Sequence, residues 1–371
     1  MAELTVSPPQ TRVGRFELLD YLRFVAAAMV VLMHYLVNGI AGGKVTSLSA
    51  NDWAIPWAKY GYMGVSLFFL ISGFVITKSS HGKTARQFAV GRAVRLYPSF
   101  WVALLFTSVV AMFFANDQMS VTVPQILVNA TMIPGDLRVA PVDGVYWTLA
   151  YELKFYFLVF LFLFFGKGRW LDRFIPAWTV VMVAISVVSF HHSTTIPYAG
   201  GYYLLFAAGA LIAHIRDHGP RWWTVVPLLG AYVMSVRFAM DEADQFLAHK
   251  GTALNADVVG VIMTVFFMAV ASMCIPWVAA LQLPHARSIG ALTFPIYLLH
   301  AHFGYMMLNH FATDQNKWLV YPVLIAVLLS LAWLLHWAVE TGPRMAWWKQ
   351  LFDRTIGRFV GAVQPAGAEA A

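Results

Sequence analysis

The chain has 371 residues, of which 60% are hydrophobic, 15% aromatic and only 12% charged. Soluble domains carry about 45–50% apolar and about 25% charged residues, so this chain has too little charge to cover a soluble surface. The composition excludes a soluble globular protein, a disordered chain, a collagen and a disulfide scaffold, and it predicts a protein that crosses a membrane several times.

The formal net charge of +7 does not indicate a nucleic-acid-binding protein. Basic residues in such proteins cluster with polar ones, whereas here they punctuate apolar runs. A single cysteine, Cys274, excludes an internal disulfide and a thiol metal cluster.

Ten apolar runs are long enough to cross the hydrocarbon core as helices, which need about 20 residues. They are continuous rather than alternating, so we expect an all-α bundle and not a strand barrel. The first run is too long for a cleaved signal and has no small-x-small site after it. The predicted spans are Leu18–Asn38, Tyr60–Thr77, Tyr97–Ala115, Tyr146–Phe165, Phe174–Phe190, Tyr198–Ile215, Trp222–Phe238, Asp257–Ile275, Ile289–Phe311 and Trp318–Val339.

The lysines and arginines predict the orientation of this bundle. With the N-terminus inside, 17 of the 25 fall in inner segments, 6 in outer segments and two within spans. This bias follows the positive-inside rule and predicts that both termini are cytoplasmic. We therefore expect a cytoplasmic N-terminal arm at 1–15, a transmembrane domain at 16–342 and a cytoplasmic C-terminal tail at 343–371. The polar arm and the Ala/Gly-rich end Val363–Ala371 have compositions typical of disorder.

Charge is expensive in lipid, so ionisable residues within spans are the first candidates for function. Arg23 and His34 in the first run are 11 residues apart, which returns them to nearly the same helix face, about 16 Å apart along the axis. Asp20 is three residues before Arg23 and can pair with it. The structural alternatives are a snorkelling anchor for Arg23 and a neutral, hydrogen-bonded imidazole for His34. The functional alternative for His34 is a buried base that takes a proton near neutral pH.

Two further segments carry candidates of the same kind. In the second run, Gly61, Gly64, Ser72 and Gly73 are small residues that favour close helix packing. In the following loop, Arg92 and Arg95 are three residues apart and share one helical face. Paired guanidinium groups suit phosphate, and the alternatives are ordinary positive-inside charge and lipid headgroup contact.

The fourth and ninth runs contain a carboxylate and two histidines. Glu152 needs a partner in a membrane and is either a structural ion-pair member or a site residue, and Lys154, two residues later, faces away from it. His300 and His302 are two residues apart and cannot bind one metal from a regular helix, so we predict no metal site.

In this order, the motifs resemble the acyltransferase-3 family of integral-membrane acyltransferases. LDYLRFVAAAMVVLMH is similar to the family's Arg-x10-His first span, and GRAVRLYP to its Arg-x-x-Arg and Tyr-Pro element. YWTLAYELKFY resembles its Trp-Ser/Thr-Leu element with a Glu, and FPIYLLH its late Pro-x-Tyr-Leu-x-His element. GVSLFFLISGFVI lies between the first two, so the resemblance runs from Leu19 to His300.

The resemblance implies an O-acyltransferase, most simply an O-acetyltransferase, that uses cytoplasmic acyl-CoA such as acetyl-CoA. The acceptor would be a hydroxyl of a cell-surface or exported carbohydrate, including a lipid-linked one, and the location a bacterial cytoplasmic (inner) membrane. His34, Glu152 and His300 would be the catalytic residues, with His34 as general base or transient acyl carrier. Family members often have a second acidic residue beside the Glu, and here Leu153 stands in its place. A fused extracytoplasmic domain, found in some members, is not expected here.

The same reasoning predicts where the donor binds. Arg23, Arg92 and Arg95 would hold the phosphate-bearing end of acyl-CoA at the inner face, with Tyr97 of the same loop element. The pantetheine arm would pass Gly64 and Ser72 to bring the thioester to His34. The alternatives are a proton-coupled transporter of a small glycan or metabolite, against which there is no inverted repeat, and a polysaccharide-assembly scaffold without chemistry. The acceptor, the acyl group and the oligomeric state are not specified by the sequence.

Overall fold

The computed structural model describes residues 16–188, 198–250 and 253–365, and within these ranges the structure is helical with no β-strand. The predicted N-terminal arm and the end of the tail at 366–371 lie outside the described residues. The longer helices are α1 Glu17–Met33, α4 Gly64–Ser80, α5 Ala85–Phe114, α7 Trp147–Phe164, α8 Leu171–Val188, α9 Tyr202–His218, α10 Trp222–Lys250, α11 Ala256–Ala271, α13 Ala286–Leu299, α14 Ala301–Phe311, α15 Lys317–Val339 and α16 Gly342–Phe352. The shorter ones are α2 Gly39–Ala41, α3 Ile55–Ala58, α6 Val123–Asn129, α12 Pro276–Ala279 and α17 Arg358–Val363.

Eight helical segments of the described residues are long and apolar enough to cross a membrane, which confirms an all-α multi-pass membrane protein. The other two predicted spans correspond to α9, which has 17 residues, and to the pair α13 and α14. The count of ten spans and the cytoplasmic location of the termini remain predictions.

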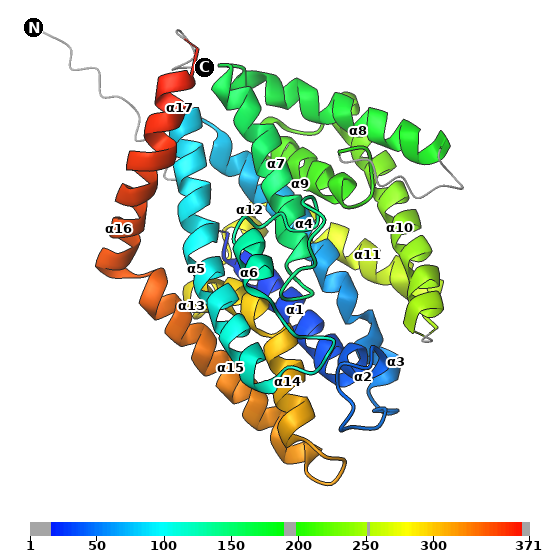
Figure 1. The fold of residues 1–371 in the computed structure, drawn as a ribbon. Helices are drawn as coiled ribbons and strands as arrows, with labels where there is room; N and C mark the ends of the chain where they lie inside the picture. The colour runs from blue at the N-terminus through cyan, green and yellow to red at the C-terminus, as the bar shows by residue number, and fades with distance from the viewer. Residues whose placement is uncertain (1–15, 189–197, 251–252, 366–371) are drawn as a thin grey trace, which may run out of the picture.

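Helix α4 lies at the centre of the bundle, beside α1 (Figure 1). In the segment 55–80, 78% of the most apolar stretch is buried, against 28% in 317–339 at the periphery. Small residues make this possible: a Cβ on Gly64 would lie 2.4 Å from the carbonyl oxygen of Ala26, and one on Gly73 would lie 2.0 Å from that of Phe206. The predicted role of these glycines in close helix packing is thereby confirmed.

Helix α1 changes pitch at the residue that the sequence singles out. His34–Asn38 forms a π-helical turn in which the Gly39 N–H donates to the carbonyl of His34. Such wide turns insert one residue into a helix and occur frequently at functional sites. His34 is thus the first residue of a local irregularity.

The predicted ninth span is divided into α13 and α14 at His300, five residues after Pro295. Pro295 lies inside α13, and the His300 N–H still donates to the carbonyl of Ile296 at 3.1 Å, so the division comes after the turn that the proline affects. The division brings His300, Ala301 and His302 to the level of the π-helical turn of α1, within the bundle.

Helix α5 begins with a capping box, in which Thr84 and Gln87 satisfy each other's backbone N–H groups, and it carries Arg92 and Arg95 in its first three turns. Helix α16 follows the last span and lies along α5 (Figure 1). Its Phe352 packs on Tyr97 and Trp101 of α5. The predicted tail therefore contains ordered helix up to Val363.

Candidate functional site

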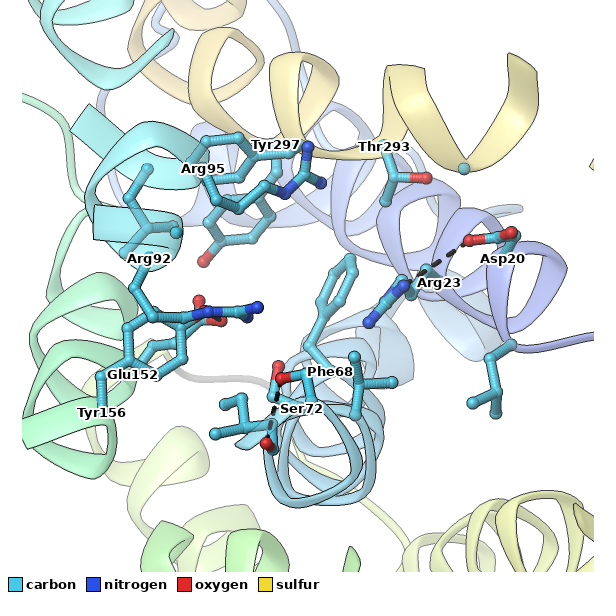
Figure 2. A pocket seen from close by; sticks show the side chains of 18 of the residues that line it. Asp20, Arg23, Phe68, Ser72, Arg92, Arg95, Glu152, Tyr156, Thr293 and Tyr297 are labelled. Atoms are coloured by element: carbon cyan, nitrogen blue, oxygen red, sulfur yellow. Dashed lines mark hydrogen bonds and ion pairs between the residues drawn. The ribbon is translucent and has the colours of Figure 1, made fainter. Parts of the chain in front are cut away.

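A cavity of about 880 Å³ opens among α1, α4, α5, α7 and α13. Figure 2 shows side chains from these helices converging on it, with Arg23, Arg92 and Arg95 pointing inward from different sides. Three of the four residues predicted to bind the donor's charged end therefore share one space. Its charged and polar lining includes Asp20, Arg23, Ser72, Lys78, Ser79, His81, Lys83, Arg92, Arg95, Thr148, Glu152, Tyr156, Thr293, His336 and Glu340.

Arg23 approaches the cavity from α1. Its Nη1 lies 3.6 Å from Oδ1 of Asp20, so the predicted pairing within one turn of helix is confirmed (Figure 2). Asp20 is buried, whereas the Arg23 side chain keeps 26% of its surface exposed. Asp20 thus supports the charge of Arg23 from the protein side and leaves the guanidinium facing the cavity.

Arg92 and Glu152 form the opposite wall together with Tyr156. The Tyr156 hydroxyl donates to Oε1 of Glu152 at 2.5 Å, and the Arg92 guanidinium lies 5.4 Å from the centre of the Tyr156 ring. The Nε of Arg92 is buried and has no hydrogen-bond partner among the described residues. An unsatisfied guanidinium nitrogen in a basic cavity is suited to an anionic ligand.

Arg95 is held from a different direction. Its Nη1 lies 3.5 Å from Oε2 of Glu340 at the end of α15, and its guanidinium is 5.3 Å from the Phe294 ring. Glu340 also accepts from the Ser99 hydroxyl at 2.7 Å and lies 2.9 Å from Nδ1 of His336. This network fixes the carboxylate, and the carboxylate in turn orients Arg95.

The loop between α4 and α5 extends the basic lining with two groups outside the spans. The hydrogen bond with Asp172 raises the pKa of His81 above its ordinary value, more strongly than burial lowers it. Burial, reinforced by the charge of Arg92, lowers the pKa of Lys83. Tyr97 of the same predicted element does not line this cavity, because its ring packs on Trp101 and its hydroxyl is 3.5 Å from the Thr131 carbonyl.

A second cavity of about 250 Å³ lies further along the bundle and contains His34. Helices α1, α4, α7 and α14 all contribute to it. Its lining is Val30, Met33, His34, Asn38, Lys44, Tyr62, Val65, Gly144, Val145, Trp147, Tyr202, Tyr297, Ala301, His302 and Tyr305.

Two aromatic neighbours orient the imidazole of His34. Its Nδ1 forms a short hydrogen bond with the Tyr305 hydroxyl, which also accepts from the Asn38 amide at 3.0 Å. The ring of His300 stands edge-on to it, with the ring centres 4.9 Å apart. His300 itself is fully buried, and its Nδ1–H donates to the Tyr297 carbonyl at 2.8 Å. The structure therefore places His300 beside His34, whereas Glu152 lies in the other cavity.

A polar network joins the loops that hold Lys44 and Asp143 to this cavity. Lys44 Nζ lies 2.8 Å from Nε2 of His302, and the backbone N–H of His302 donates to Oδ2 of the fully buried Asp143. Lys154 does face away from Glu152, since its Nζ contacts Asp136 of the preceding loop at 2.5 Å.

Sequence reasoning missed Tyr305, Asp143 and Glu340. Tyr305 lies in the predicted ninth span, five residues after the FPIYLLH segment, but its contact with His34 joins residues 271 positions apart. Asp143 lies in a loop without periodicity, and Glu340 follows the last apolar run. For Glu340, the available signal was a carboxylate next to an apolar run. A carboxylate within an apolar run is the similar signal that singled out Glu152.

Comparisons with known proteins match most of the chain. A family model described as "Acyltransferase domain" matches residues 16–337. The chain is 28% identical over 162 residues to the exopolysaccharide production protein ExoZ of Rhizobium meliloti, covering 41% of this chain and 50% of that protein. It is 25% identical over 361 residues to nodulation protein 10 of Rhizobium leguminosarum bv. viciae, covering 85% and 90%.

A third similarity is shorter. Over 85 residues the chain is 28% identical to the peptidoglycan O-acetyltransferase OatA of Listeria monocytogenes, which covers 21% of this chain and 14% of that protein. The matched segments thus span half of the first relative and a small part of the third. No solved structure matches the chain.

Proposed function

The chain belongs to the acyltransferase-3 family, and from this premise we propose that it moves an acetyl group from cytoplasmic acetyl-CoA to a hydroxyl of an exported or cell-surface carbohydrate. Two relatives are named for exopolysaccharide production and for peptidoglycan O-acetylation, which supports a carbohydrate acceptor. The location that fits this task is a bacterial cytoplasmic membrane, with the basic cavity facing the cytosol.

One observation carries the proposal: a basic cavity and a histidine cavity lie in succession along the same helices. Arg23 of α1 lines the first, and His34, at the start of the π-helical turn that continues α1, lines the second, about 16 Å further along the helix axis. A donor held by its phosphates at one end would extend its thioester toward the other. An acceptor would enter from the opposite side, past Lys44 and Trp147.

The donor's charged end would be bound by guanidinium groups. Arg92 and Arg95 come from one face of α5 and Arg23 from α1, so they surround a phosphate from two sides. Charge-assisted hydrogen bonds of this kind contribute about 1.5–3 kcal/mol each. Asp20 and Glu340 hold two of these arginines in place by ion pairs.

His34 would remove the proton from the acceptor hydroxyl while its oxygen attacks the thioester carbonyl. The carbon–sulfur bond then breaks, an ester forms, and the departing thiolate accepts the proton from the imidazolium of His34. Tyr305 and His300 fix the orientation of the ring during both transfers. A positioned base of this kind contributes about 10²–10⁴-fold to the rate.

The test has two parts. Deletion of the gene should remove an acyl mass from one class of surface glycan, as measured by mass spectrometry. Complementation with His34→Ala should leave that mass absent, while His310→Ala, a histidine of α14 that packs on Phe114 and Phe311, should restore it. Near-normal acylation by inserted His34→Ala protein would contradict the assignment of the base.

Donor binding is tested separately with purified protein. Arg92→Ala and Arg95→Ala should each weaken acetyl-CoA binding by roughly 10- to 100-fold in calorimetry. Arg237→Ala is the matched control, since Arg237 belongs to α10 and pairs with Asp241. If both α5 variants bound acetyl-CoA with unchanged affinity, the assignment of this cavity as the donor site would be wrong.

A further inference from the structure

The two cavities meet at a defined level of the bundle. Along α4 and the 3₁₀ turn Lys59–Met63 before it, Tyr62 lines the histidine cavity and Ser72 the basic one, and Val65 lines both. Along α13 and α14, His302 lines the histidine cavity and Thr293 the basic one, and Tyr297 lines both. Val65 and Tyr297 therefore form a partition between the two spaces.

The Tyr297 half of this partition is fixed. Its hydroxyl lies 2.8 Å from Oγ1 of Thr148 and 3.2 Å from the carbonyl of Val145, both in the chain segment that begins α7. Its ring also receives Phe68 of α4 edge-on, with the ring centres 5.5 Å apart. Tyr297 is 7% exposed and connects three helices, so it cannot move without disturbing them.

Val65 forms the other half and is only partly buried, because it faces cavity space on both sides. It is β-branched, so its side chain has one strongly preferred rotamer in a helix and does not swing aside. The level at which the two cavities meet is thus lined by one rigid aliphatic side chain and one anchored ring.

We propose that Val65 and Tyr297 are specificity-determining residues that restrict the transferred acyl group to a short chain. The inference rests on the proposed function, in which the thioester must reach His34 from the basic cavity. The acyl group leads the donor through the partition and enters a cavity of about 250 Å³, which is below the about 300–1,000 Å³ typical of ligand pockets. That space must also admit the acceptor hydroxyl, so each added methylene competes with the acceptor.

The first experiment changes the width of the partition. Membranes from the deletion strain that carry each variant are supplied with an equal mixture of acetyl-CoA and butyryl-CoA, and glycan-bound acetyl and butyryl are measured by mass spectrometry. Val65→Ala should raise the butyryl-to-acetyl ratio by about tenfold or more, since one methylene is worth about 10- to 200-fold in discrimination. Tyr297→Phe, which removes the tie to Thr148, should raise it in the same direction.

The second experiment narrows the partition. Val65→Met should abolish transfer of both acyl groups while acetyl-CoA still binds the basic cavity with its original affinity in calorimetry. This split between binding and transfer distinguishes a blocked passage from an unfolded protein, which would lose both.

Val236→Ala is the matched control, because Val236 of α10 is also a half-buried valine and lines neither of the two cavities. It should keep the original acyl ratio. Normal total transfer by Val65→Ala with an unchanged ratio would overturn the partition while leaving the acyltransferase intact. Loss of every acyl product in the unmodified protein would instead overturn the proposed function.

Discussion

At the scale of single residues, the main result is the pair of side chains that contact His34. A tyrosine hydroxyl and a second imidazole contact it, and both come from the segment that follows Pro295. A histidine that serves as a base needs one ring nitrogen fixed so that the other is aimed at the substrate. Tyr305 supplies this fixing contact, and Asn38 holds the tyrosine in turn.

Tyr305 is accordingly predicted to be a positioning residue. Tyr305→Phe keeps the ring and removes the hydroxyl, so His34 loses its Nδ1 partner. We expect the transfer rate to fall about 10- to 100-fold with the KM for acetyl-CoA unchanged, since a hydrogen bond to a charged group is worth about 1.5–3 kcal/mol. Steady-state kinetics across pH 5.5–8.5 measure this, and the pH profile should change shape because the environment of the imidazole changes.

Tyr35→Phe is the control for this prediction. Tyr35 is also fully buried, and its hydroxyl has no hydrogen-bond partner among the described residues. Its removal should leave the rate and the pH profile as they are. Equal losses in both variants would mean that Tyr305 acts through packing and does not orient His34.

At the scale of elements, α16 acts as a strap along α5, the helix that carries Arg92 and Arg95. Arg86 of α5 makes two hydrogen bonds, of 2.9 and 2.7 Å, with the carboxylate of Asp353. Phe352, which is 5% exposed, packs with Trp348 against Tyr97 and Trp101. The exposed ion pair is screened by solvent, so the buried ring should hold the strap.

Phe352→Ala should therefore release α16 from α5, while Asp353→Asn should not. Truncation of a buried phenylalanine costs about 3–5 kcal/mol in a packed core. Limited proteolysis of the purified protein reads out the release as rapid cleavage near residues 342–363. Faster cleavage in Asp353→Asn than in Phe352→Ala would show that charge, and not packing, holds the strap.

The junction of α4 and α8 is predicted to depend on pH. Nε2 of His81 lies 3.6 Å from Oδ1 of Asp172, and that contact raises the pKa of His81, with a further contribution from Asp217. A raised pKa means that the stabilisation is fully present below the unfolded value of about 6.5 and is lost as pH rises through the folded value. The pair is about half exposed, so its contribution should stay below about 1 kcal/mol.

Thermal unfolding in detergent between pH 5.5 and 8.5 checks this. The protein should lose a small part of its stability as the pH rises across this range, and His81→Gln should remove that part of the slope. A slope that is identical in the variant would assign the pH dependence to other groups, such as His214, which also faces Asp172 at 3.3 Å.

At the scale of the whole molecule, the orientation proposed from the positive-inside bias can be tested with single cysteines. Cys274 is the one native cysteine, and Cys274→Ser provides a background without thiols. Gln315, in the exposed connection between α14 and α15, is predicted outside, and Arg354, after α16, inside. A membrane-impermeant maleimide should label Gln315→Cys in intact cells, and Arg354→Cys only after permeabilisation. The reverse pattern would invert the proposed donor and acceptor sides.

Much of this architecture follows from the sequence because lipid imposes strong rules. Apolar runs predict the helices, and the Arg23–Asp20 spacing predicts an ion pair that the structure contains. The convergence of Arg23, Arg92 and Arg95 on one cavity was expected from the sequence motifs. The periodicity of each helix could not predict it, because it depends on how α1 and α5 pack.

The rest depends on contacts between distant segments. The Tyr305 hydroxyl reaches His34 across 271 positions, and Glu340 reaches Arg95 across 245. No periodicity within one helix encodes such pairs. The division of α13 from α14 and the π-helical turn likewise begin at His300 and His34, which are not helix breakers, so neither position is marked in the sequence.

The partition at Val65 and Tyr297 has a consequence for the membrane itself. If two aqueous cavities entered a bilayer from opposite faces and joined, they would form a continuous water path that conducts ions. Such a path would dissipate an electrochemical gradient across the membrane. Val65 and the tethered ring of Tyr297 place apolar surface where the two cavities meet. In the proposed function, these two side chains would let substrates meet from opposite faces without a continuous water path between the faces.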